Sequence, residues 1–403
     1  MVQKCAGRVA VSISACFQDK ARQRRLIGHQ SRTFDFQFHP SEDFAVSASE
    51  DGTARVWDLQ NSKCVATLKG HTDEVLRVSW ALPATETAVT LATGSADGTV
   101  RLWGLPRGQG AVRRAGKYRH LECLGQLSHR GPGLDGQVYS CHFLPGGSEA
   151  LGSCGLSANL LTASDSSLHF WDVGTQSRVS QRRLLKVGEH SIGGGRNPSD
   201  LPFVFDTKIG AGGALAVALS DGTVRVGDLR CTTTSDNDFV LHAASNAPLT
   251  GLCWSADGET LVSCAGDGKV TVWDTSMWAA RAVFCGHEKP VYGAAFYPSD
   301  QQRQNHFREH QGTGGQEGRA LGGLGPSSLL LSWSSDGTIM AWDCATASGR
   351  VDSPLATMNT GGFNIFHCAL SGDGNRLAVA GGGGTPSAFV GMPVRLCDLS
   401  GLG

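Results

Sequence analysis

Histidine, serine, aspartate and tryptophan recur together along the chain, and these residue types are the ones most able to do chemistry. Gly-His pairs at 28–29, 70–71 and 286–287 are each followed by a Ser-x-Asp-Gly-Thr segment that leads to a tryptophan. A serine, a histidine and an aspartate can form a hydrolytic triad. They can also satisfy one another, because a buried aspartate needs a partner and an imidazole that bridges to a serine and a tryptophan N–H supplies it. We expect this structural role for them.

Sequence motifs for other chemistry are missing. The sequence has no P-loop, no G-x-G-x-x-G that opens a helix, no H-E-x-x-H and no nucleophile elbow. The glycine run 381–384 is not followed by a lysine and a helix, so we interpret it as a loop. The thirteen cysteines are scattered singly, which favours reduced thiols over a zinc site or a disulfide framework. We expect no enzyme activity, no cofactor and no metal.

Composition narrows the class of protein further. Glycine contributes 54 of 403 residues, and charged residues make up 18% with a net charge of −1, so no overall field attracts nucleic acid or an anionic membrane. The 40% hydrophobic content supports a sizeable core. No apolar run is long enough to predict a transmembrane helix. Within an N-terminal segment 1–21, residues 8–17 are short and interrupted by two serines, so we interpret them as a β segment of mature sequence rather than a signal peptide.

A segment ending in or near Trp-Asp is repeated seven times, and this repeat determines the fold. An alternating apolar segment precedes the copies, most clearly at 75–80, 249–254 and 291–296. Alternation with period two and Asp-Gly turns are typical of short antiparallel strands joined by hairpins. One such sheet cannot bury both of its faces, so the copies must stack around a channel. The copies occupy residues 49–58, 95–103, 164–172, 220–228, 266–274, 334–343 and a degenerate 394–398.

The Gly-His, Ser-x-Asp-Gly-Thr and Trp-Asp pattern resembles the WD-repeat (transducin beta-like) family of β-propellers, from about Arg22 to Leu399. The resemblance implies an all-β fold, a seven-bladed β-propeller of four-stranded antiparallel blades within residues 22–403. In that family an N-terminal strand completes the last blade, and residues 22–27 are available for this role. The wide spacing of some copies predicts insertions at 106–136, 188–202, 299–328 and 381–393.

The resemblance also assigns the conspicuous polar residues to structural hydrogen-bond tetrads. In the third and fifth copies, Ala163 and Ala265 stand in the serine position beside Asp165/Trp171 and Asp267/Trp273. Gly227 and Cys397 replace tryptophan in the fourth and seventh copies, so packing should hold those blades. The three complete sets are His29, Ser49, Asp51 and Trp57; His71, Ser95, Asp97 and Trp103; and His287, Ser334, Asp336 and Trp342.

In this family, the residues on either side of the first apolar position of the inner strand lie in a bulge at the upper rim, and bulges often re-aim a side chain. The residue after this position is aromatic in five of the seven copies, a composition expected of an interaction hot spot. The seven residues are Phe34, Leu76, Tyr139, Phe205, Thr250, Tyr292 and Phe366. The preceding residues are Arg32, Glu74, Gln137, Phe203, Pro248, Pro290 and Asn364. Alternatively, the aromatic side chains pack between blades.

We therefore expect a non-catalytic scaffold or adaptor that binds a peptide or protein partner on an aromatic-lined upper face, within a multiprotein complex in the cytoplasm or nucleus. Two alternatives remain. Asp228 and Arg230 resemble the Trp-Asp-x-Arg ending of substrate receptors of cullin-4 ubiquitin ligases, although Gly227 makes the match incomplete. A propeller enzyme would line its channel with carboxylates. The basic segment 113–120 could contact RNA or phosphate, but without a wider basic face we expect no nucleic-acid partner, and we expect no small-molecule substrate.

Overall fold

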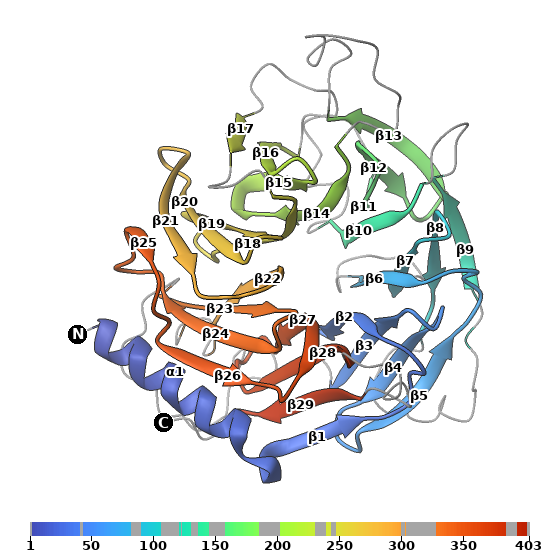
Figure 1. Ribbon diagram of the computed structural model, residues 1–403. Coiled ribbons are helices and arrows are strands. Elements are labelled where there is room, and N and C mark those ends of the chain that lie inside the picture. Colours follow the sequence, from blue (N-terminus) through green and yellow to red (C-terminus); the bar gives the residue numbers. More distant parts are fainter. Residues whose placement is uncertain are drawn as a thin grey trace, which may run out of the picture.

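The computed structural model describes residues 2–40, 43–81, 90–105, 121, 123–129, 136–144, 158–184, 202–229, 239–242, 247–299, 303, 328–383 and 393–400. Seven sheets, each built on four antiparallel strands, are arranged in a ring (Figure 1). The prediction of a seven-bladed β-propeller is confirmed. The expected basic segment 113–120 and Arg230 lie outside the described residues, as do insertion residues 188–201 and most of 299–328.

Blades 1 to 4 follow one another along the chain, and each runs from the ring centre outward. Their strands are β2 (Thr33–Phe38), β3 (Phe44–Ser49), β4 (Ala54–Asp58) and β5 (Lys63–Leu68); β6 (Val75–Trp80), β7 (Leu91–Ser95), β8 (Thr99–Trp103) and β9 (Cys123–Ser128); β10 (Val138–Phe143), β11 (Leu160–Ser164), β12 (Ser167–Asp172) and β13 (Ser177–Arg183); and β14 (Val204–Ile209), β15 (Ala214–Leu219), β16 (Thr223–Asp228) and β17 (Phe239–His242). A short 3-10 helix, η4 (Ala211–Gly213), precedes β15. β9 lies inside the predicted insertion 106–136 and supplies the outer strand of blade 2.

Blades 5 to 7 complete the ring with less regular connections. Their strands are β18 (Leu249–Trp254), β19 (Thr260–Ala265), β20 (Lys269–Asp274) and β21 (Ala279–Cys285); β22 (Val291–Phe296), β23 (Leu329–Ser334), β24 (Thr338–Asp343) and β26 (Ala356–Asn359); and β27 (Phe363–Leu370), β28 (Arg376–Gly383), β29 (Val394–Asp398) and β1 (Gln23–Leu26). β28 extends to Gly383, into the predicted insertion 381–393.

The N-terminal strand closes the ring, as expected from residues 22–27. β1 follows a 3-10 helix, η1 (Lys20–Arg22), and pairs antiparallel with β29, with Gln23 opposite Cys397 and Leu26 opposite Val394. Blade 7 therefore contains strands from both ends of the chain, and unfolding either end removes a strand from this blade.

The hydrophobic core lies between blades. All six residues of β3 are buried, because each face of a blade packs on a neighbour and leaves no solvated side. One apolar cluster occupies each junction between adjacent blades, for example Phe36 and Trp57 of blade 1 with Ala378 and Val394 of blade 7. Large buried side chains at every junction make the ring a single packed body.

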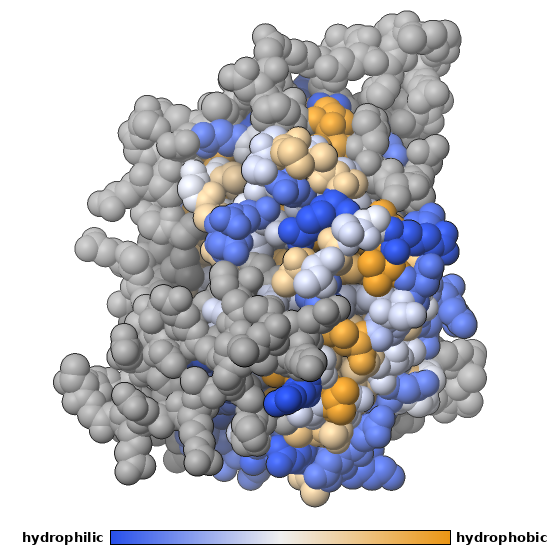
Figure 2. All heavy atoms as spheres, turned by 90° about the vertical axis from the view of Figure 1, so that its left-hand side faces the viewer, coloured by the Kyte–Doolittle hydropathy of each residue, from blue (hydrophilic) through white to orange (hydrophobic). Residues whose placement is uncertain are grey.

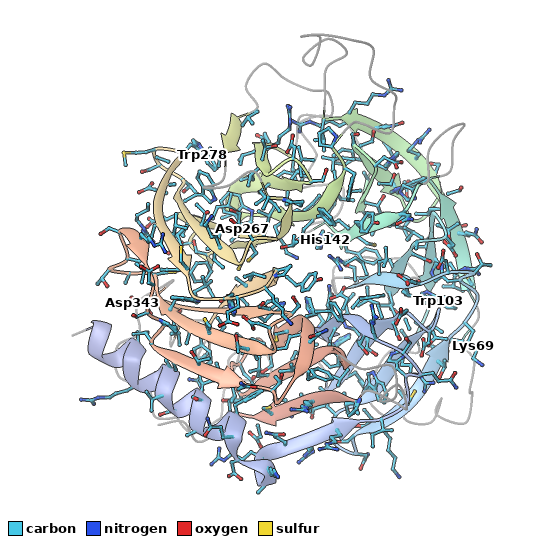
Figure 3. All side chains as sticks on the ribbon, viewed as in Figure 1. Lys69, Trp103, His142, Asp267, Trp278 and Asp343 are labelled. Carbon is cyan, nitrogen blue, oxygen red and sulfur yellow. The ribbon has the colours of Figure 1, made fainter. Side chains whose placement is uncertain are left out.

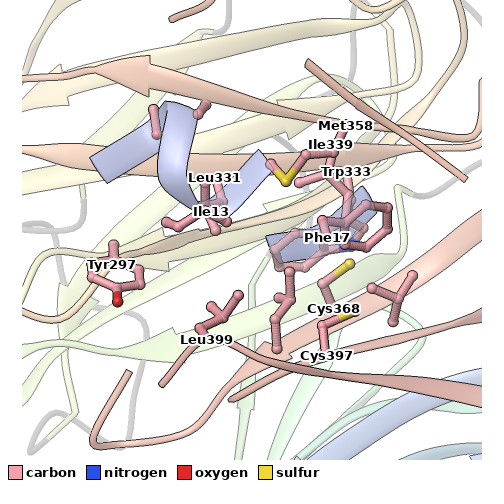
Figure 4. Packing of buried hydrophobic residues seen from close by; sticks show 14 of the residues in the cluster. Ile13, Phe17, Tyr297, Leu331, Trp333, Ile339, Met358, Cys368, Cys397 and Leu399 are labelled. Carbon is pink, nitrogen blue, oxygen red and sulfur yellow. The ribbon is translucent and has the colours of Figure 1, made fainter. Parts of the chain in front are cut away.

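The interpretation of residues 8–17 as a β segment was wrong, because residues Val2–Gln18 form the helix α1. The alternation of Val9, Val11 and Ile13 suggested a strand, whereas the buried residues Ala6, Ala10, Ile13 and Phe17 follow helical spacing. This face packs on β24, β26 and β29 and joins the cluster at the junction of blades 6 and 7 (Figure 4). Among the described helices, none has both the length and the apolar character to cross a membrane.

Blade 5 gains a fifth strand that the repeat pattern does not predict. β25 (Gly349–Val351) leaves blade 6 after β24 and pairs parallel with β21, with Arg350 opposite Val283. Arg281 Nη2 also donates a hydrogen bond to the carbonyl of Cys344 at 2.8 Å. On this side of the molecule the exposed hydrophobic residues form separate small groups among hydrophilic ones (Figure 2).

Candidate partner-binding face

The inner strand of every blade is bulged near its start. Each inner strand shifts register by one residue near its start, and the extra residue is the one expected there: Phe34, Leu76, Tyr139, Phe205, Thr250, Tyr292 and Phe366. A bulge breaks the alternation of side chains, so this residue need not face the same interface as its neighbours, although Tyr292 still packs against the apolar cluster between blades 6 and 7. The same local geometry is therefore presented seven times around the ring.

Three of these side chains form an aromatic cluster across blades 1, 7 and 6, which we call the Phe366 cluster. The ring of Phe366 lies 5.7 Å from that of Phe34 and 5.2 Å from that of Tyr292, both edge to face. All three are half-buried, so each keeps part of its ring accessible. Burial raises the pKa of Tyr292, and its hydroxyl stays neutral at physiological pH. The cluster offers a fixed apolar surface with one polar edge.

A second aromatic cluster, the Phe203 cluster, spans blades 3 and 4. Phe203 lies 4.7 Å from Phe205 and 5.9 Å from Tyr139, measured between ring centroids. Phe203 is 37% exposed, more than the other two rings. The sequence pattern assigns Phe203 only to the set of residues of mixed type that precede the first apolar position of each inner strand. Its aromatic type beside two other aromatic positions was the signal that could have identified it.

Two of the seven bulge residues do not contribute to an aromatic surface. Leu76 is 9% exposed and packs inside the ring. The Thr250 hydroxyl donates hydrogen bonds to the carbonyls of Cys264 and Val291, so it joins backbone segments of blades 5 and 6. The aromatic side chains at and beside the bulges thus form two groups, the Phe366 cluster and the Phe203 cluster, with blades 2 and 5 between them.

Charged groups border the Phe366 cluster. Arg32 Nε lies 3.7 Å from Glu50 Oε2, and the positive charge of Arg32 acts on both Tyr292 and Glu74. Burial, followed by the negative charges of Glu50 and Asp73, raises the pKa of Glu74. Arg32 and Glu74 therefore lie close enough to interact electrostatically.

The predicted histidine–aspartate–tryptophan networks form in blades 1, 2 and 6. His29 Nδ1 lies 2.8 Å from Asp51 Oδ2, His29 Nε2 lies 2.7 Å from Ser47 Oγ, and Trp57 Nε1 donates to that hydroxyl at 2.8 Å. The same arrangement joins His71, Asp97, Thr93 and Trp103 in blade 2, and His287, Asp336, Ser332 and Trp342 in blade 6.

The serine assigned to each tetrad was wrong by two residues. Ser47, Thr93 and Ser332 make the network instead of Ser49, Ser95 and Ser334. Positions two apart share one face of a strand, so both hydroxyls point to the same interface, and only the position of the indole distinguishes them. The later serine shapes the turn: the Ser49 hydroxyl donates to the Arg32 carbonyl at 2.7 Å and accepts the Asp51 N–H at 3.2 Å.

Blades 3 and 5 keep part of the network for the same reason. Trp171 Nε1 donates to Thr162 Oγ1 at 2.7 Å, and Trp273 Nε1 donates to Ser263 Oγ at 3.0 Å, so Ala163 and Ala265 are not the linking positions. In blade 3, His129 Nε2 also bonds Thr162 at 2.7 Å. Within the described residues, the buried His129 Nδ1 has no hydrogen-bond partner.

Electrostatics support a structural role for the tetrads. Burial by itself would raise the pKa of Asp51, but hydrogen bonds from His29 and Thr53 hold it well below its ordinary value. Asp97 and Asp336 behave in the same way. Burial lowers the pKa of His29, which therefore remains neutral. An ionised carboxylate that binds a neutral, enclosed imidazole is a stable pair with no position for a substrate.

Of the two residues predicted to contact a ligase adaptor, the structure describes only Asp228. Asp228 ends β16, is half-buried, and its carbonyl accepts a hydrogen bond from Arg182 Nη1 at 3.2 Å. Arg230 lies outside the described residues. The arrangement around Gly227 therefore adds nothing to the resemblance seen in the sequence.

These features define a repeat propeller in which every inner strand is bulged and five blades keep all or part of one hydrogen-bond network. The family described as "WD domain, G-beta repeat" matches residues 20–58, 62–104 and 235–274. Over these residues the chain matches the WD-repeat family, and its seven blades have the fold that the resemblance implies.

Relatives of the chain include nuclear distribution protein PAC1 of Arthroderma otae, 26% identical over 287 residues, which cover 68% of this chain and 56% of that protein. Denticleless protein homolog of Mus musculus is 24% identical over 310 residues, 72% of this chain and 39% of that protein. Eukaryotic translation initiation factor 3 subunit I of Debaryomyces hansenii is 31% identical over 88 residues, 22% of this chain and 24% of that protein. The chain spans about half the length of the first of these relatives.

Proposed function

We propose that this propeller is a non-catalytic scaffold that binds a peptide segment of a partner protein on its upper face, with an apolar residue of the peptide on the Phe366 cluster. The observation that carries the proposal is the meeting of Phe34, Tyr292 and Phe366, which stand at the bulges of three consecutive blades and are half-buried. Half-buried aromatic side chains add contact area at a small cost in side-chain entropy.

The borders of the cluster fit the same function. Arg32 and Glu74 supply opposite charges next to an apolar surface, as at the polar rim of an interface. The ring is closed by β1 and packed at every junction, so little order has to be gained when a partner binds. WD-repeat relatives such as nuclear distribution protein PAC1 support a scaffold assignment by class.

The test is affinity purification with mass spectrometry, in which the wild-type chain is compared with a Phe34→Ala/Tyr292→Ala/Phe366→Ala variant. Partners that need this face should be lost from the triple variant. Met277→Ala is the matched control, because Met277 is 73% exposed in the β20–β21 turn, at the end of blade 5 opposite the bulge. An unchanged set of partners in a folded triple variant refutes the proposal.

The alternative functions have less support. A channel enzyme would need free carboxylates, whereas Asp35 and Asp206 on the inner strands accept the N–H groups of Val78 and Leu252 in the next blades. The assignment as a substrate receptor of a cullin-4 ubiquitin ligase rests only on the resemblance at Asp228 and Arg230. For that function, Gly227→Trp should strengthen binding to the ligase adaptor, and an unchanged affinity counts against it. We place the protein in the cytoplasm or nucleus, where free thiols such as Cys64 and Cys253 persist.

A further inference from the structure

The strand β1, which completes blade 7, is the outermost strand of its sheet, whose order is β1-β29-β28-β27. It lies on the outer border of the ring, where side chains project away from the blades (Figure 3). In the described part of the chain β29 is its only strand partner, so every second N–H and C=O group of β1 points away from the sheet. Such an edge is a template for another strand.

Two arginines stand directly opposite each other at this edge. Arg25 of β1 is the register partner of Arg395 of β29, and like charges in opposite positions destabilise a sheet. Arg395 is fixed, because its Cζ lies 5.1 Å from the centroid of the Phe363 ring and its Nη1 donates to the carbonyl of Thr360 at 3.0 Å. Burial, followed by the positive charge of Arg25, lowers the pKa of Arg395, as expected when two guanidinium groups repel each other. Within the described residues neither arginine has an ion pair, so this pair lacks a counter-charge.

An apolar side chain accompanies Arg25 on the same face of β1. Positions two apart share one face of an extended strand, so Arg25 and Ile27 lie on one face and Leu26 on the other. The exposures agree with this alternation, since Arg25 is exposed, Leu26 is 1% exposed and Ile27 is 68% exposed. Arg24 belongs to the opposite face, where its Nη1 donates to the carbonyl of Leu59 in blade 1 at 3.3 Å. The accessible face of β1 therefore offers a cation and an apolar group two residues apart.

Blade 5 shows that the outer edge of a blade in this ring accommodates an added strand. β25 has three residues and pairs parallel with β21, the outermost of the four regular strands of that blade. β1 occupies the same outermost position in blade 7, but no fifth strand covers it within the described residues. A short extended segment is therefore sufficient to extend a blade of this propeller.

We propose that an extended acidic segment of a partner protein adds to the free edge of β1 as a fifth strand of blade 7, with a carboxylate against Arg25 and Arg395 and an apolar side chain against Ile27. In strand addition, main-chain hydrogen bonds supply affinity and alternate side chains supply specificity. A carboxylate accepts charge-assisted hydrogen bonds from both guanidinium groups and removes their mutual repulsion. A second copy of the chain is disfavoured as the occupant, because pairing two β1 edges brings like charges together. The inference is independent of the function proposed for the Phe366 cluster.

The experiment titrates the full chain with a short fluorescein-labelled peptide in which glutamate and valine take turns at every second position, with threonine between them. Fluorescence polarisation gives the affinity, and hydrogen exchange measured by mass spectrometry locates the contact. We expect saturable binding and slower exchange of the amides of residues 23–27. A peptide with lysine in place of glutamate should not bind. A peptide with proline in place of threonine keeps the charge but loses the backbone donors, and it should bind at least about fivefold more weakly.

Arg25→Gln and Arg395→Gln should each weaken binding of the glutamate peptide about fivefold. Arg183→Gln is the matched control, because Arg183 is an exposed arginine on the outermost strand of blade 3 and its register partner is the uncharged Ser167. The affinity of this control should stay within about twofold of the wild-type value. If Arg395→Gln disturbs the contact with Phe363 and fails to fold, Arg25→Gln and the proline peptide still decide.

Several results would overturn the proposal: no binding to the wild-type chain, equal affinities of the Arg25→Gln and Arg183→Gln variants, or equal binding of the proline peptide, which would indicate charge attraction without strand addition. A short single-stranded oligothymidylate that binds with the same dependence on Arg25, and more tightly than the peptide, would instead make this edge a nucleic-acid contact. The Phe34→Ala/Tyr292→Ala/Phe366→Ala variant should bind the peptide as the wild type does. Loss of binding in that variant would place the peptide on the Phe366 cluster rather than on β1.

Discussion

The hydroxyl that links histidine to tryptophan allows a stability prediction that can be worked out atom by atom. Asp51 is ionised and His29 is neutral, so His29 Nδ1 carries the proton and Nε2 accepts from the Ser47 hydroxyl, which in turn accepts from Trp57. Ser47→Ala leaves two buried polar atoms without partners. At about 1–3 kcal/mol for each such atom, the variant should lose roughly 2–6 kcal/mol of the free energy of unfolding.

Blade 5 provides the internal comparison. Ser263 bonds Trp273 at 3.0 Å, and the described residues give this hydroxyl no histidine partner, so Ser263→Ala should cost only about 1–3 kcal/mol. Ser47→Thr should be nearly neutral, because threonine makes the same contacts at Thr93 and Thr162. Equilibrium urea unfolding followed by tryptophan fluorescence measures all three variants. The reasoning fails if Ser47→Ala costs no more than Ser263→Ala, or if Ser47→Thr is as damaging as Ser47→Ala.

Two further predictions concern acid and the N-terminal helix. Burial lowers the pKa of His129 from 6.5 to about 3, so the unfolded chain binds a proton that the folded one excludes, and stability should fall as pH drops from 6.5 towards 3. A His129→Gln variant should show a shallower fall in thermal midpoint over that window, and an unchanged slope contradicts the assignment. Phe17→Ala should cost about 3–5 kcal/mol, because Phe17 is 2% exposed between α1 and blades 6 and 7. Val11→Ala, at a residue 60% exposed on the same helix, should change the unfolding free energy little, and equal losses in the two variants would show that the helix is not docked in solution.

The repeat made most of the fold predictable, because the copies place their strands and turns in the same order and five of the seven keep the tryptophan. Seven copies give seven blades, and one alignment of the first strands located all seven bulges, since a bulge is a local backbone feature with a fixed place in the repeat. The closing strand followed from the family pattern and pairs with β29. Local, repeated information was therefore sufficient for the architecture.

The errors arose where more than one structure fits the same local pattern. Ser47 and Ser49 occupy one face of β3, so only the position of the Trp57 ring identifies the linking hydroxyl. Residues 8–17 fit both a strand and a helix, and the groove between blades 6 and 7 selects the helix by burying Ile13 and Phe17. β25 pairs with a strand more than sixty residues earlier, which no local signal can predict.

The bulge also connects the proposed partner-binding face with the centre of the ring. In each inner strand the bulge residue is followed directly by the residue that faces a neighbouring blade or the channel, as in Phe34 with Asp35 and Phe366 with His367. Asp35 and His367 lie 3.3 Å apart, and the rings of Phe34 and Phe366 lie 5.7 Å apart one residue away. The contact between Phe34 and Phe366 and the contact between Asp35 and His367 therefore share the strands β2 and β27. Because β2 and β27 also pack against each other, a partner that moves either strand should alter the histidine environment in the channel.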